Sequence, residues 1–186
     1  VSLSGLGGEL AIGAIGNDAG GENSGHVRVY EYSNNTWTQK GSDIDGELAG
    51  DNSGISVSLN HYGTVLSVGA TGNDANGENS GHTRTYSYNE IDQTWVNISN
   101  DIDGEAIGDQ SGYSVSMNYN GDIVGIGAYL NDGTNGENSG HVRVYEVLPL
   151  SGTCVLGDTL IETDQEYCEI QNINTNYHTI QGKKIK

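Results

Sequence analysis

Gly21-Glu22-Asn23-Ser24-Gly25-His26 returns at residues 77–82 and again at residues 136–141, and this repetition decides the fold. The copies begin 56 and 59 residues apart. Trp37 likewise returns as Trp95, 58 residues later. A period of this length is typical of units that stack on one another to bury a shared core. We therefore expect two nearly complete units and part of a third.

Each complete unit is predicted to form four short antiparallel strands. Apolar alternation and turn residues place those of the second unit at residues 55–59, 64–70, 81–88 and 94–98. The polar loop at residues 72–80, with the turn pair Asn76-Gly77, separates the second strand from the third. The composition agrees, because 29 Gly, 11 Tyr and a single Pro suit many turns and pleated sheets better than helices.

A small four-stranded sheet is only marginally stable alone, and radial stacking of such sheets is the β-propeller solution. We predict an all-β fold: a partial β-propeller of about three blades at residues 1–147, then a short β-rich segment at residues 148–186. A β-sandwich would lack this internal period, and a calcium-binding β-roll needs a nonapeptide repeat. Because residue 1 falls inside a repeat, we expect the chain to be a segment of a longer protein.

The net charge of −18, from 7 Lys and Arg against 25 Asp and Glu, excludes nucleic acid as an expected partner because it would repel phosphate. Strong acidity suits a saline exterior, or divalent cations that neutralise clustered carboxylates. We expect no membrane span in this segment. The triplets Asn34-Asn35-Thr36 and Asn97-Ile98-Ser99 match the glycosylation acceptor, which matters only for a secreted protein.

Histidine and arginine recur at equivalent positions, and all three arginines of the chain take part: His26, Arg28, His82, Arg84, His141 and Arg143. We interpret them as architectural, with arginine forks pairing with carboxylates and pinning a neighbouring blade. The alternative is a catalytic or anion-binding pair. Trp37 and Trp95 are interpreted as blade packing, with a sugar-stacking site as the alternative.

Two acidic segments place carboxylates at alternate positions before or after a glycine: Asp43, Asp45, Glu47 and Asp101, Asp103, Glu105. They are candidate Ca²⁺ ligands, but the twelve-position EF-hand pattern is missing, so we favour a solvated turn whose Asp side chains cap backbone amides. A second acidic set lies in the repeated loops and is predicted to share one rim, as a hypothesis for calcium-assisted adhesion: Asp18, Glu22, Asp74, Glu78, Asp132 and Glu137.

Ser53-Gly54-Ile55-Ser56-Val57-Ser58, followed by residues 65–70, resembles the FG-GAP repeat that builds the seven-bladed propeller of integrin alpha chains. The same blocks recur at residues 111–116 and 123–128, and the resemblance covers residues 1 to about 147. It implies a propeller that binds and adheres and does not catalyse. The sequence departs from the family where Pro often follows Gly-Ala and where Phe opens the first pair, at Ile15, Thr71, Tyr129, Ser53 and Ser111.

In calcium-binding members of that family the hairpin between the first two strands carries alternating Asp and Asn ligands. Here those hairpins are residues 60–63 and 118–122. They offer too few oxygens for a cation that takes six to eight, so we do not carry the calcium site over.

Residues 152–163, which contain Cys154, resemble the opening of a Hint module, the self-processing fold of hedgehog proteins and inteins. The resemblance implies that Cys154 is the nucleophile that attacks the carbonyl of Thr153 to form a thioester. That chemistry also needs a positioned acid or base, normally in a Thr-x-x-His motif downstream. We interpret the setting of His178 as unlike that motif and expect the segment to be inert. The alternative is an ordinary β extension with Cys154 and Cys168 buried or disulfide-linked.

The hypothesis from the sequence is a non-catalytic binding or adhesion propeller for a protein or glycan ligand, outside the cell or on a particle surface, joined to a self-processing module. One alternative is an enzyme whose axial site is completed by further blades. Another is a purely structural spacer.

Overall fold

A computed structural model describes residues 1–147 and, beyond them, six two-residue strands. The chain divides into two compact units, Val1–Leu148 and Pro149–Lys186. All regular elements of the described residues are β strands, and none of these residues forms a helix that could span a bilayer. The strands of the second unit pair antiparallel in sequence order: β14 (Val155–Leu156), β15 (Thr159–Leu160), β16 (Glu162–Thr163), β17 (Glu166–Tyr167), β18 (Thr179–Ile180) and β19 (Lys183–Lys184).

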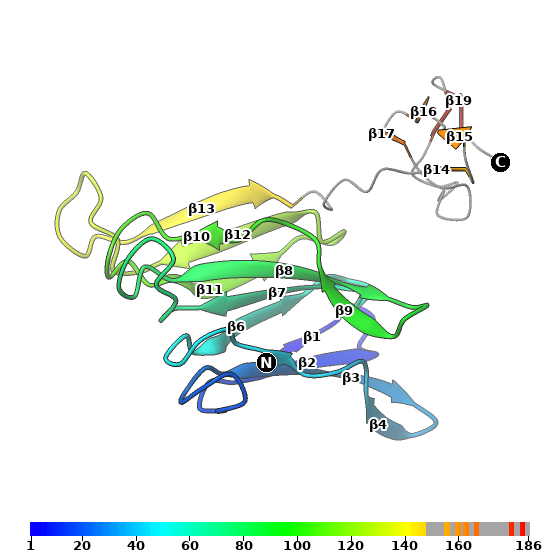
Figure 1. The fold of residues 1–186 in the computed structure, drawn as a ribbon, viewed down its shortest axis with the longest axis horizontal. Coiled ribbons are helices and arrows are strands. Elements are labelled where there is room, and N and C mark those ends of the chain that lie inside the picture. Colours follow the sequence, from blue (N-terminus) through cyan, green and yellow to red (C-terminus); the bar gives the residue numbers. More distant parts are fainter. Residues whose placement is uncertain are drawn as a thin grey trace. The chain divides into compact units, whose positions relative to one another are not determined.

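The first unit holds three antiparallel sheets, one for each repeat (Figure 1). The first sheet contains β1 (Ser2–Leu3), β2 (Glu9–Ala14), β3 (His26–Ser33), β4 (Thr36–Gln39) and β5 (Ile44–Asp45). The second contains β6 (Ser53–Leu59), β7 (Val65–Ala70), β8 (His82–Asn89), β9 (Thr94–Asn97) and β10 (Ile102–Asp103). The third contains β11 (Ser111–Met117), β12 (Ile123–Ala128) and β13 (His141–Glu146).

The segment predicted to be a solvated loop after the fourth strand is instead a short fifth strand. β5 pairs with the start of β3, and β10 pairs with the start of β8. Ile44 explains the pairing, because its side chain is buried with Val27 and Val29 in the core of the stack. The long third strand of each complete sheet therefore has two short partners on one edge, the fourth strand beside its end and the fifth beside its start.

Neighbouring sheets approach closely enough for backbone to contact backbone. A Cβ on Gly13 would lie 1.9 Å from the carbonyl oxygen of Gly54, and a Cβ on Gly69 would lie 2.0 Å from that of Gly112. Gly54 and Gly112 have φ of +88° and +86°, in the left-handed region that favours glycine, at a bulge in the first strand of their sheets. The repeated Ser-Gly and Gly-Ala pairs are thus the places where one sheet rests on the next.

A thin apolar core runs through the first two sheets. Its buried members are Ala11, Val27, Val29, Ile44, Val57, Leu59, Leu66 and Val68. A smaller cluster in the third sheet contains Val124, Ile126 and Val147. The alternation of apolar and small polar side chains in the sequence produces these layers, because successive residues of a strand face opposite sides of the sheet.

The outer face of the third sheet is open. Val142 and Val144 on β13 are 71% and 69% exposed. Their equivalents on β3, Val27 and Val29, are 0% and 1% exposed, because the second sheet covers them. β13 of the third sheet therefore exposes two apolar side chains, whereas the equivalent side chains of the first sheet are covered by the second sheet.

Candidate functional site

The recurring histidines and arginines occupy the first and third positions of β3, β8 and β13. Side chains two residues apart in a strand lie on the same face of the sheet, so each arginine follows its histidine along one face. In the first two sheets the short fifth strand brings an Asp opposite each histidine, because the pairing registers are His26 with Asp45 and His82 with Asp103. The site is thus built from strands that are adjacent in space and distant in the sequence.

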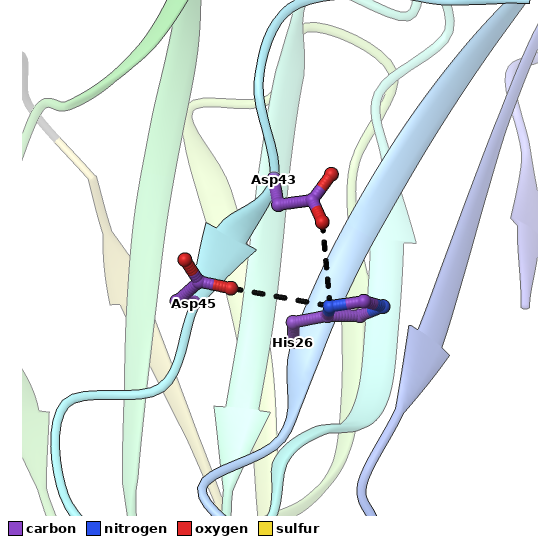
Figure 2. Close-up of side chains that lie close together, drawn as sticks. All are labelled: His26, Asp43 and Asp45. Atoms are coloured by element: carbon purple, nitrogen blue, oxygen red, sulfur yellow. Dashed lines mark ion pairs between the residues drawn. The ribbon is translucent and has the colours of Figure 1, made fainter. Parts of the chain in front are cut away.

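In the first sheet, His26 lies between two carboxylates that come from the fifth strand and the residues before it (Figure 2). Its Nδ1 is 3.6 Å from Oδ2 of Asp43 and 3.9 Å from Oδ1 of Asp45. Both separations exceed hydrogen-bond length, and the buried Nδ1 has no hydrogen-bond partner in the part of the chain that the structure describes. The His26 side chain is 8% exposed, whereas that of Asp45 is 46% exposed. The Asp45 carboxylate therefore lies beside the buried imidazole and is itself accessible to solvent.

Asp43 is held by Arg28 and Gln39. The guanidinium of Arg28 donates to both carboxylate oxygens, with Nη2 2.7 Å from Oδ2 and Nε 2.9 Å from Oδ1. Gln39 Nε2 donates to Oδ1 at 2.7 Å. The hydrogen bonds from Arg28 lower the pKa of Asp43 to about 2, against the opposing effect of burial. Asp43 is therefore a carboxylate across the whole neutral range.

The second sheet repeats this arrangement with a carboxylate from the preceding unit. His82, Asp101 and Glu47 place potential ligand atoms within 4.8 Å of one another. Arg84 lies among them, with Nη2 2.9 Å from Oε1 of Glu47 and Nε 2.6 Å from Oδ1 of Asp101. The hydrogen bonds with Asp101 raise the pKa of Arg84, and those from Arg84 lower the pKa of Asp101. Burial lowers the pKa of His82, and the charge of Arg84 adds to that effect.

The third sheet keeps the contact with the preceding unit. Nη1 of Arg143 lies 3.2 Å from Oε1 of Glu105, and Nδ1 of His141 lies 3.6 Å from Oε2 of the same side chain. Arg143 also donates to the carbonyl oxygen of Asp103 at 3.0 Å. Two of the three arginines thus contact a carboxylate of the preceding unit, while Arg28 contacts a carboxylate of its own.

The aspartates of the Asp-Ile-Asp segments were predicted to cap backbone amides, but other aspartates form these caps. Asp51 and Asp109 accept those hydrogen bonds, from the amides of Leu48 and Ala106 at 3.1 and 3.0 Å. Both caps are buried. Asp51 and Asp109 recur 58 residues apart in the sequence, but this recurrence alone does not indicate which backbone amides they cap.

The two tryptophans differ in their surroundings. Trp95 is partly buried, packs on Tyr88 at 5.3 Å between ring centroids, and donates from Nε1 to the carbonyl oxygen of Lys40 at 2.9 Å. Trp37 packs on Tyr32 at 5.1 Å and is 42% exposed. Trp95 thus bridges the first and second units, whereas Trp37 occupies the equivalent position on the first sheet.

The acidic loops at residues 17–25, 73–81 and 131–140 lie at the same end of the stack, on the left in Figure 1. One Asp in each loop accepts a hydrogen bond from a backbone amide across the loop, at 2.7 to 2.8 Å; the three are Asp18, Asp74 and Asp132. The glutamates at the next acidic position of each loop are exposed; they are Glu22, Glu78 and Glu137. The aspartates stabilise the loops, and the glutamates face solvent.

The hairpins at residues 60–63 and 118–122, where the resemblance to the FG-GAP repeat would place calcium ligands, are closed by asparagine. Oδ1 of Asn60 accepts from the amides of Thr64 and Val65, and Oδ1 of Asn118 accepts from those of Gly121 and Ile123. These two oxygens accept hydrogen bonds within their own turns.

Cys154, Cys168 and His178 lie outside the described residues. The sequence itself corrects one expectation about them. Thr175 precedes His178 by three positions, so a Thr-x-x-His motif is present. Its histidine lies 24 residues after Cys154.

No family model matches the chain, and no curated protein matches it.

Proposed function

We propose that residues 1–147 belong to a β-propeller of the FG-GAP kind that binds a partner without catalysis, displayed outside the cell or on a particle surface. The observation that carries the proposal is that one set of recurring side chains forms contacts within the stack, whereas another set is exposed on loops. The three arginines, His26, His141 and Trp95 contact carboxylates or backbone within and between successive sheets, whereas the exposed glutamates lie on loops at one end of the stack.

The open face of the third sheet supports a propeller with further blades. Val142 and Val144 stand where Val27 and Val29 are covered by the next sheet. Gly127 occupies the position of Gly13 and Gly69, and the three atoms nearest to a Cβ there would belong to Ser114 in its own sheet. A fourth sheet in the same register would bury both valines and place a backbone carbonyl against Gly127, as in the earlier repeats.

The loop end is the proposed binding face, defined here by Glu22, Glu78, Glu137, Leu48 and Ile107. Leu48 and Ile107 are 64% and 71% exposed. The amides of Gly50 and Gly108, close to them in the chain, donate to the carbonyl oxygens of Glu22 and Glu78 at 2.9 Å. Carboxylates and apolar side chains therefore lie together on braced loops, which suits a protein partner that offers basic and apolar groups.

The glycan alternative has less support. Stacking of sugars needs an exposed aromatic face, and the tryptophans lie on β4 and β9, away from the loop end (Figure 1). Trp95 donates a hydrogen bond to the carbonyl oxygen of Lys40 in the preceding unit. Trp37 is the equivalent residue of the first sheet and is exposed.

Binding to immobilised peptides tests the proposal. An array that spans basic, acidic and neutral apolar peptides is probed with the 186-residue chain, beside a glycan array. We expect retention on basic peptides with apolar residues, and its loss in a triple variant E22Q/E78Q/E137Q. The matched control is D92N, an exposed acid on the β8–β9 hairpin at the other end of the stack. Equal retention of the triple variant and the control would contradict the binding face, and retention only on glycans would favour the alternative.

For the tail we propose a Hint-like module in which Cys154 attacks the Thr153 carbonyl carbon, its sulfur replacing the Cys154 nitrogen to form a thioester and free an amine. Thr175-x-x-His178 supports it. Hydroxylamine would then release residues 1–153, seen by mass spectrometry. A C154S variant is expected to stay intact. Cleavage in neither protein would reject the module.

A further inference from the structure

We propose that His26, Asp43 and Asp45 form a Zn²⁺ site in the first sheet. The three residues bring Nδ1 of a histidine and two carboxylate oxygens within 4.8 Å of one another. Figure 2 shows both carboxylates directed at the same ring nitrogen. Ligands at about 2.0–2.1 Å around a tetrahedral zinc ion stand roughly 3.4 Å apart. The observed separations of 3.6 and 3.9 Å therefore need only a small contraction.

The buried imidazole is an independent indication of a ligand. Nδ1 of His26 has no hydrogen-bond partner among the described residues, although only 8% of the side chain is exposed. A buried polar atom without a partner is uncommon, because leaving it unsatisfied costs about 1–3 kcal/mol. A cation bound between the ring and the carboxylates would satisfy that atom and screen the repulsion between Asp43 and Asp45.

The donor set selects zinc over calcium. Calcium takes six to eight oxygens, whereas zinc binds imidazole nitrogen and carboxylate oxygen in four-coordinate sites. Asp45 accepts no hydrogen bond from the described residues and is 46% exposed, so it can rotate onto a metal and leave a fourth position to water. Arg28 and Gln39 donate to Asp43, as partners of a ligating carboxylate commonly do.

The second sheet offers an internal comparison. There Arg84 contacts both carboxylates of the equivalent group, Glu47 and Asp101, and its side chain is 16% exposed. Nδ1 of His82 is likewise buried without a hydrogen-bond partner among the described residues, but a guanidinium already occupies the cation position in that group. In the first sheet Arg28 contacts Asp43 and leaves Asp45 free, so the inference is restricted to the first sheet.

Site-resolved titration tests the inference. ZnCl₂ is added to the 186-residue chain carrying C154S and C168S, which removes the thiols as competing ligands, and the histidine ring ¹⁵N resonances are followed by NMR. We expect Nδ1 of His26 to shift with a stoichiometry of one, and His26→Gln to abolish that binding. Asp45→Asn should weaken it at least tenfold, because even outer partners of a ligand contribute about 10- to 100-fold.

The matched control is Asp103→Asn, which changes the equivalent position of the second sheet and should leave zinc affinity unchanged. Far-UV circular dichroism checks that each variant is folded. The inference is overturned if the His26 resonances do not move at millimolar zinc. It is also overturned if both Asp variants weaken binding equally, or if an equal concentration of Ca²⁺ displaces the zinc.

Discussion

At the scale of single residues, Arg84 shows why the ionisable side chains recur. It contacts Asp101 of its own unit and Glu47 of the preceding unit, so it ties two sheets together with one planar group. Arginine suits this position because its fork donates to two carboxylates at once and stays charged at any physiological pH. Recurrence therefore reflects a junction that has to be made again in each repeat.

Replacing Arg84 with Ala is expected to lower the melting temperature. The half-buried carboxylate of Asp101 and the exposed carboxylate of Glu47 would lose their charged donor, at a cost of about 2 kcal/mol. For a unit of this size that corresponds to roughly 4–8 °C. Arg28→Ala is the control, because that side chain is 43% exposed and its surface pair should contribute within about 1 kcal/mol. Differential scanning calorimetry that finds Arg84→Ala unchanged would contradict the role of this residue.

Asp43 gives the stability a defined pH dependence. Its folded pKa of about 2 lies below the ordinary value of 3.8. The carboxylate therefore stabilises the fold above pH 3.8, and this contribution is lost as the pH falls through about 2. We expect the difference in melting temperature between the wild type and Asp43→Asn to shrink on acidification across that window. A difference that stays constant down to pH 2 would show that the pair with Arg28 contributes no stability.

The sequence predicts that arginines meet carboxylates, but it cannot say which ones. His26 and Asp43 are separated by 17 positions, and their meeting depends on the register of β5 against β3. That register is set by Ile44 entering the core, which is a tertiary effect. The same holds for Glu47, whose partner belongs to another unit.

At the scale of elements, the four principal strands of each complete repeat were predictable and the fifth was not. Residues 55–59 and 64–70 were expected as strands, and β6 and β7 span Ser53–Leu59 and Val65–Ala70. Alternating side chains and turn residues mark such strands directly. β5 and β10 have two residues each, too few for any alternation, so only their pairing with a long neighbour defines them.

The contact between sheets makes Gly69 a sensitive position. A Cβ there would lie 2.0 Å from the backbone oxygen of Gly112, so Gly69→Ala must push the second and third sheets apart. We expect a loss of about 1–3 kcal/mol, the usual cost of overpacking. Gly125→Ala is the matched control, because its nearest atom would be 3.9 Å away. Urea denaturation of the two variants measures the difference, and equal midpoints would contradict the close packing.

At the scale of the whole molecule, residues 1–147 form a stack in which each sheet supports the next. The first two sheets share one apolar core, and backbone bridges join Gly25 to Ser53 and Gly81 to Ser111 across the junctions. The repeat period was enough to predict this stacking, because small sheets with two apolar faces need neighbours. Val142 and Val144 of β13 mark the face of the third sheet that no further sheet of the described residues covers.

Amide hydrogen exchange in the Gly69→Ala variant tests the stacking most directly. If the sheets form one cooperative unit, disturbing the contact between Gly69 and Gly112 should accelerate exchange in β11 and β12 as well as in β6, β7 and β8, while Gly125→Ala should leave the protection of β6–β8 unchanged. Faster exchange confined to the second sheet would show that the repeats fold as independent modules, and the account of recurring side chains as junctions would fail.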